Sequence, residues 1–87
     1  MAYLLIRHKV ANFANWKRGY DAHAPARRKA SLRQKALLRS VRNPREVFIL
    51  LQAGNLKKAK GFASSPHLRK AMKAAGVRGK PEINILK

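Results

Sequence analysis

The sequence predicts an α+β domain in which an antiparallel sheet carries two helices on one face. Apolar and polar residues alternate at the start of the chain, and a second stretch, residues 46–53, is almost continuously apolar. Apolar residues recur every three or four positions over residues 13–30 and 56–75, which is the helical period. The resulting order, β-α-β-β-α-β, is that of the ferredoxin-like fold. The 87 residues suit one such domain, residues 1–87.

The first strand and helix have the clearest patterns. One face of a strand at residues 2–10 is predicted to be buried, and its members are Leu4, Ile6, His8 and Val10. Asn12 suits the N-cap of the first helix, which we expect to run from residue 13 to residue 30. Its apolar stripe contains Phe13, Trp16 and Tyr20. Pro25 removes one backbone hydrogen bond, so we expect a bend there.

The second half of the chain repeats the strand and helix pattern. Strands are expected at residues 35–42, 46–53 and 82–86, with a turn at residues 43–45. Asn55 suits a helix N-cap, Ser65 and Pro66 suit the start of a second helical piece, and Gly76 suits its C-terminal end. The sheet face without helices would carry Leu5, Leu37, Ile49 and Leu51. Such an apolar face needs a cover, so we expect a homodimer.

Charge is the unusual property of the chain. Lys and Arg total 21 and Asp and Glu total 3, a formal net charge of +18, and the bases are spread over the whole sequence. This favours nonspecific binding of polyanions such as nucleic acid or acidic proteins. No apolar run approaches the length of a membrane-spanning helix and the first residues lack a signal-peptide pattern, so we expect a soluble, cytoplasmic protein.

Five stretches resemble the dimeric α/β-barrel superfamily of antibiotic-biosynthesis-monooxygenase-like proteins. They are residues 3–10, 13–17, 20–24, 46–50 and 62–72. The resemblance implies two ferredoxin-like domains that pair into an α/β barrel. Its members include quinone-forming monooxygenases that need no cofactor, and haem-degrading enzymes. The Asn, Trp and His arrangement of the haem-degrading members is not matched, so we expect no cofactor.

The basic surface departs from that family. Lys57 and Lys58 are predicted in the first turn of a helix, where the helix dipole favours acids, and Arg69 and Lys73 are like-charged neighbours four residues apart. The pattern is typical of a barrel whose surface acids have been replaced, as in deliberate positive supercharging. An engineered supercharged scaffold is therefore the first functional hypothesis. A natural, extremely basic relative is the alternative.

The candidate catalytic residues are His8 and His23, because a neutral imidazole suits a general base. The expected pocket between sheet and helices would be lined by Trp16, Tyr20, Phe48, Phe62 and Met72. These residues would also suit an ordinary core, and a single inward histidine is more often a hydrogen-bonded core residue. The histidines lack the spacing of a metal site, and the chain has neither a glycine-rich phosphate loop nor a serine nucleophile elbow.

Two basic runs are the candidate anion-binding residues. They are Arg27, Arg28 and Lys29 in the first run, and Lys57, Lys58 and Lys60 in the second. No helix-turn-helix, zinc-finger or aromatic RNA-binding pattern accompanies them, so sequence-specific recognition is not expected. Two alternatives to the scaffold remain open: a small cofactor-independent monooxygenase acting on an aromatic substrate, and a natural nucleic-acid-binding module.

Overall fold

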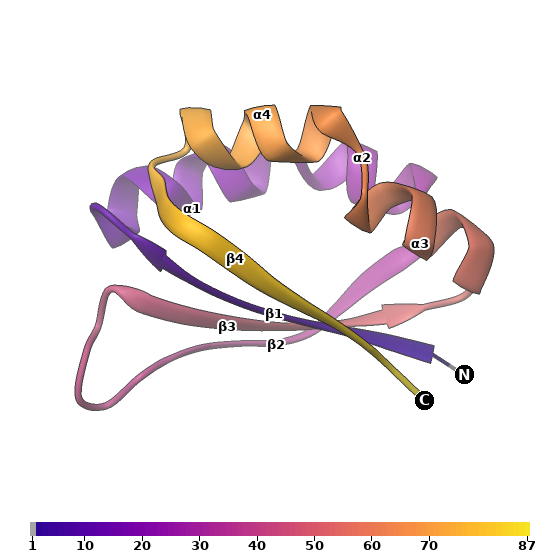
Figure 1. Cartoon of the computed structure of the whole chain (residues 1–87), viewed down its shortest axis with the longest axis horizontal. Coiled ribbons are helices and arrows are strands. Elements are labelled where there is room, and N and C mark those ends of the chain that lie inside the picture. The colour runs from indigo at the N-terminus through magenta and orange to yellow at the C-terminus, as the bar shows by residue number, and fades with distance from the viewer. Residues whose placement is uncertain (1) are drawn as a thin grey trace.

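Four antiparallel strands form one sheet, and four helices lie over one of its faces (Figure 1). The structure is a computed structural model that describes residues 2–87. The strands are β1 (Ala2–Val10), β2 (Leu32–Arg39), β3 (Glu46–Ala53) and β4 (Val77–Leu86). The helices are α1 (Phe13–Ala22), α2 (Ala24–Lys29), α3 (Leu56–Ala63) and α4 (Pro66–Ala74). The strand order β2-β3-β1-β4 confirms the predicted ferredoxin-like fold, with each helical segment divided in two.

The first helix differs from the prediction because it ends before Pro25. The amide of His23 still donates to the carbonyls of Gly19 and Tyr20, which closes α1. Pro25 has no N–H to donate to the carbonyl of Asp21, so the helix restarts as α2 with Pro25 in its first turn. The predicted bend is therefore a break between two helices. It places His23 at the junction.

Two strands have different bounds from those expected. β2 begins at Leu32 and ends at Arg39. It ends there because the hydroxyl of Ser40 accepts hydrogen bonds from the amides of Arg42 and Asn43, which starts the turn. β4 begins at Val77, five residues earlier than expected. The register between β1 and β4 shifts at an irregularity that contains Gly79, whose φ is +70°. This irregularity lets β4 continue to Leu86.

Three predicted helix starts and one predicted helix end are confirmed. The side chains of Asn12 and Asn55 each accept a hydrogen bond of 3.0 Å from the amide three residues ahead. The hydroxyl of Ser65 caps α4, directly before Pro66. Gly76 follows the last turn of α4 with φ +88°, a conformation that glycine adopts without strain.

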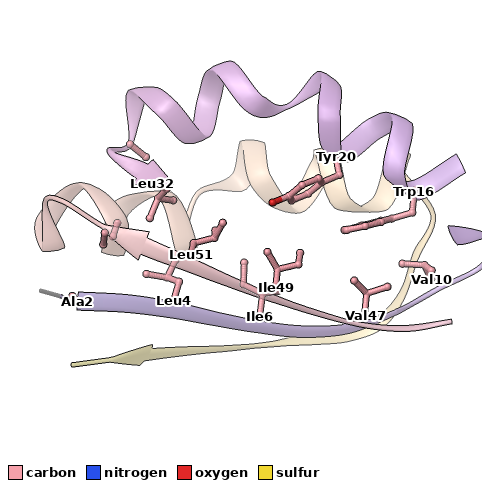
Figure 2. Packing of buried hydrophobic residues seen from close by; sticks show 13 residues of the cluster. Ala2, Leu4, Ile6, Val10, Trp16, Tyr20, Leu32, Val47, Ile49 and Leu51 are labelled. Atoms are coloured by element: carbon pink, nitrogen blue, oxygen red, sulfur yellow. The ribbon is translucent and has the colours of Figure 1, made fainter. Parts of the chain in front are cut away.

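The core lies between the sheet and the helices (Figure 2). Cross-strand pairs such as Leu4 with Leu51 and Ile6 with Ile49 put the apolar face of β1 against that of β3. The fully buried strand side chains are Leu4, Val10, Val47, Ile49 and Leu51. Trp16 and Tyr20 point down from α1 onto this layer (Figure 2). The alternation of buried and half-buried residues is complete along β3.

The opposite face of the sheet has no helix over it (Figure 1). The expectation that Ile49, Leu51 and Leu37 lie there is wrong, since their positions in the register turn them towards the helices. Leu5 does lie on this uncovered face, as expected, and the register places with it four other apolar residues: Leu38, Phe48, Leu50 and Leu86. Leu38 is 62% exposed and Leu86 is 44% exposed. An apolar face of this kind exists, but with a different membership.

Candidate functional site

A cavity lies between the sheet and the four helices, each of which contributes to its lining. Its internal volume is about 40 Å³, and about 430 Å³ is unfilled when the open space at its mouth is included. Its floor is formed by Ile6, Ile49 and Leu51, and its walls come mainly from the helices. The helix residues that line it are Trp16, Gly19, Tyr20, His23, Arg27, Phe62, Leu68, Ala71, Met72 and Ala75. His8 is the polar residue that β1 contributes.

The spacing of residues along α1 and α2 places four side chains in this cavity. Trp16, Tyr20, His23 and Arg27 follow one another at intervals of four, three and four residues. This spacing keeps side chains on one face of a helix, and the break at His23 does not interrupt it. Arg27 was predicted only as a surface anion-binding residue, although the interval of seven residues from Tyr20 is a sequence signal for its inward position.

His8 is the buried polar residue of the core, with 4% of its surface exposed. Within residues 2–87 neither ring nitrogen has a hydrogen-bond partner. The ring instead meets the indole of Trp16 edge-on, with 5.3 Å between ring centroids. Burial lowers the pKa of His8 from 6.5 to about 4, so the imidazole is neutral at pH 7. A hydrogen-bonded core histidine, the more common case, would have a partner here.

Tyr20 anchors the polar end of the cavity. Its ring stacks on Trp16 at 4.9 Å, and its hydroxyl donates to Oε1 of Gln34 at 2.7 Å. The guanidinium of Arg27 lies 3.6 Å from the centroid of the Tyr20 ring, and its Nη1 donates to the Tyr20 carbonyl at 2.7 Å. Burial is the main cause that raises the pKa of Tyr20 and lowers the pKa of Arg27. These contacts hold both side chains in one orientation.

His23 lies between two rings of the second half of the chain. The centroid of Phe62 is 5.9 Å away and that of His67 is 5.3 Å away. The Nε2 atom of His23 is buried, and the described residues offer it no hydrogen-bond partner. Burial, followed by the nearby His67 and Arg27, lowers the pKa of His23. A second neutral imidazole therefore lines the cavity, close to Arg27.

Small residues let the helices approach closely around the cavity. A β-carbon added at Gly19 would lie 2.9 Å from the β-carbon of Ala75, so α1 and the end of α4 are in near contact there. Ala71 and Ala75 then contribute little bulk to the cavity wall. The sequence predictions did not include these positions, because glycine and alanine carry no pattern that separates a cavity wall from an ordinary helix.

Most of the predicted pocket residues come together here, with one exception. Trp16, Tyr20, Phe62 and Met72 line the cavity, whereas Phe48 does not. Phe48 pairs with Arg7 across the strands on the uncovered face, with the guanidinium 6.0 Å from its ring centroid. The expectation that Phe48 faces the cavity is wrong, because side chains alternate along β3 and its buried face is that of the odd-numbered residues.

The two basic runs lie on different helices. Arg27 is half-buried at the cavity, and Arg28 and Lys29 follow it in the last turn of α2, where cations suit the helix dipole. Lys57, Lys58 and Lys60 are exposed on α3. In the part of the chain that the structure describes, His, Cys, Asp and Glu side chains do not gather in groups of three or more that could hold a metal ion.

The fold is shared with several solved structures. A candidate antibiotic biosynthesis monooxygenase from Bordetella bronchiseptica matches with a TM-score of 0.79 at 15% identity, over 99% of this chain and 94% of that chain. Another from Caulobacter crescentus has a TM-score of 0.71 at 21% identity, over 98% and 86%. SnoaB from Streptomyces nogalater, described as a cofactor-independent oxygenase, has a TM-score of 0.74 at 12% identity, over 99% and 90%.

These identities are low, so the likeness shows the fold and not the activity. The structural neighbours of this chain are antibiotic-biosynthesis-monooxygenase-like proteins with a ferredoxin-like fold, as the sequence resemblance implied. No protein-family model matches the sequence, and no curated protein matches it either. Over residues 2–87, none of the helices has the length and apolar character needed to cross a bilayer.

Proposed function

We propose that the cavity binds a planar aromatic molecule and that the protein oxidises it with dioxygen, without a cofactor. The observation that supports this best is His8, an imidazole with no hydrogen-bond partner among residues 2–87, in a cavity whose lining is mainly apolar and aromatic. Leaving a buried polar group unpaired costs about 1–3 kcal/mol, so a ligand that pairs with it would gain that interaction. SnoaB, a structural neighbour, is described as a cofactor-independent oxygenase.

The role of His8 would be that of a general base. Its lowered pKa, about 4, means that charging the ring at this buried position costs about 3 kcal/mol more than in water. The proton transfer is therefore favourable only when an anion forms next to the ring, which couples protonation of His8 to ionisation of the bound substrate. The stacked rings of Trp16 and Tyr20 would hold a flat substrate beside it.

The overall reaction balances with dioxygen as the oxidant. For an anthrone-like substrate, His8 takes a proton from the reactive ring carbon, and the resulting anion gives its electrons to dioxygen. One oxygen atom becomes the new ring carbonyl. The other leaves as water with the two hydrogens that the carbon loses, and the proton held by His8 returns to that water.

Turnover of an anthrone or quinol substrate tests the proposal. The change of His8 to Gln keeps a polar side chain but removes the base, and we expect a loss of about 10²-fold or more in kcat. Lys70→Gln, an exposed position on α4, is the matched control and should leave turnover unchanged. Equal turnover by the His8→Gln variant and the unchanged protein would contradict the role of His8. No turnover by the unchanged protein would contradict the enzyme.

The protein is further proposed to be a homodimer that pairs through the uncovered sheet face. Leu5, Phe48 and Leu50 are half-buried at the middle of this face, and apolar area left in water would favour association. Leu50→Asp should turn a dimer into a monomer in sedimentation at moderate salt, because it places a charge at the centre of the contact. A monomer for the unchanged protein at the same concentration would overturn this part of the proposal.

A second candidate function is nonspecific binding of polyanions by a supercharged surface, with a formal net charge of +18. All three acidic residues already contact a base: Glu46 and Glu82 contact Arg7, and Asp21 contacts Lys17. Within residues 2–87 no other Lys or Arg forms an ion pair with an acidic side chain. Lys and Arg residues lie on every helix and on every strand except β3. This distribution supports an engineered, supercharged scaffold more than a shaped nucleic-acid-binding module.

Gel shifts with unrelated duplexes separate these possibilities. A general polyanion binder should shift all of them equally and release them as salt rises, because binding depends on counterion release. A nucleic-acid-binding module would prefer one sequence and hold it at higher salt. No shift at low salt would contradict polyanion binding altogether.

A further inference from the structure

A second hollow lies beside the cavity, at the C-terminal end of α2. It is lined by residues of α2, β2, the end of β3 and the loops beside them: Ala24, Arg27, Arg28, Ser31, Leu32, Arg33, Gln34, Gln52 and Gly54. We call this hollow the arginine cleft. It holds about 1220 Å³ of space, including open solvent, and its lining contains three arginines and no acidic residue. The nearest acid along the chain, Asp21, is held by Lys17 at 2.7 Å.

Arg27 belongs to both the cavity and the arginine cleft. It is held in place by the Tyr20 ring at 3.6 Å and by the Tyr20 carbonyl, which accepts from Nη1 at 2.7 Å. Only one of its donors is used by that hydrogen bond, so the rest of the planar fork can bind an oxyanion. Because the side chain is already ordered, binding an anion costs little further conformational entropy.

Two further polar side chains, His23 and Gln34, lie near Arg27. His23 lines the cavity close enough to Arg27 for the guanidinium to disfavour its charged form. Its buried Nε2 has no partner within the described chain. Gln34 lines the arginine cleft and accepts from the Tyr20 hydroxyl through Oε1, which orients its amide group. A ligand in the cavity would therefore meet apolar walls at Phe62 and Met72, and donors where the cavity adjoins the cleft.

We propose that the arginine cleft is a phosphate subsite of the cavity, so that the bound aromatic molecule carries a phosphate group. This inference rests on the proposed binding of an aromatic ligand. Arg27, Arg28 and Arg33 match a dianion of several oxygen atoms, since guanidinium groups bind phosphate through paired hydrogen bonds. The exposed lysines of α3 offer charge without that fixed geometry. Overall charge attracts phosphate to the whole surface, but this cleft shares Arg27 itself with the apolar cavity and has no acidic residue in its lining.

Calorimetry with naphthol, naphthyl phosphate and inorganic phosphate at one fixed salt concentration tests the subsite. We expect naphthyl phosphate to bind about tenfold or more tightly than naphthol. The double variant Arg28→Gln with Arg33→Gln removes two cleft arginines that do not line the cavity, and should abolish most of that advantage. The double variant Lys57→Gln with Lys58→Gln removes the same charge from α3 and should keep it.

Three other outcomes of this calorimetry would overturn the proposed subsite or the aromatic cavity. An equal loss in the two double variants would overturn the subsite, because it would mean that overall charge alone attracts the phosphate. The absence of any advantage of naphthyl phosphate over naphthol would overturn it too. If naphthol fails to bind while naphthyl phosphate and inorganic phosphate bind equally, and the cleft variant loses both, then the aromatic cavity is refuted and the phosphate site stands alone.

Discussion

Replacing His8 by leucine should raise the free energy of unfolding and remove part of its dependence on pH. The imidazole is 4% exposed, and within residues 2–87 neither nitrogen is paired. Leucine has a similar size and carries no polar atoms. At neutral pH we expect the variant to be more stable by about 1–3 kcal/mol, the usual cost of an unpaired buried polar group.

The gap between the two proteins should widen as the pH falls. The pKa of His8 is about 4 in the folded protein, against 6.5 ordinarily, so between these values the unfolded chain binds a proton that the folded chain does not. Stability of the unchanged protein therefore falls as the pH drops from 6.5 to 4, by about 3 kcal/mol from this residue. The leucine variant lacks this contribution. Above pH 6.5 the gap should be constant.

Urea unfolding at several pH values between 4 and 7.5 measures this gap. Protein concentration and ionic strength should be held constant, since association and charge repulsion both change the apparent stability. Subtracting the two curves cancels the titration of His23 and of the carboxylates, which both proteins share. A gap that stays the same from pH 7 to pH 4 would refute the reasoning, because it would mean that His8 is solvated or hydrogen-bonded in the folded protein.

Three further predictions concern packing, a hydrogen bond and a cap. Gly19→Ala should destabilise the protein by about 1 kcal/mol or more in thermal unfolding, because the new β-carbon would lie 2.9 Å from that of Ala75. Gly61→Ala is the control: Gly61 has open space around it, so this change should be neutral or stabilising. Tyr20→Phe should cost about 1 kcal/mol in urea unfolding by removing the hydrogen bond to β2, and an unchanged midpoint would contradict that bond. Asn55→Ala should cost about 1 kcal/mol through loss of the α3 cap, with reduced helical circular dichroism before the main transition as its sign.

The elements with strong local signals were predictable. β3 has the predicted bounds, Glu46–Ala53, because its apolar run lies between a turn and a capping asparagine. The caps at Asn12, Asn55 and Ser65 depend on hydrogen bonds between residues two or three positions apart, so the local sequence is sufficient. The bounds of β2 were not predictable in the same way, because that edge strand is half exposed and its pairing with β3 is a long-range contact.

The candidate site was predictable only in part. The spacing of Trp16 and Tyr20 identified the inward face of α1, and the alternation in β1 identified His8 as inward. Neither pattern shows which face of β3 meets the helices, because that strand is apolar on both faces, and so Phe48 was misplaced. Arg27 was predicted only as a member of a basic, anion-binding run, and its inward position depends on its contacts with the ring and carbonyl of Tyr20.

By itself, the sequence determined the order of strands and helices, the helix caps and the excess of positive charge, since periodicity, capping and composition are local properties. Only the tertiary structure decided the choice of buried face in β3 and the meeting of His8, His23 and Arg27 at one cavity. Those features depend on contacts between residues far apart in the chain. Their energies come from packing and from the loss of water around each group, which no local pattern specifies.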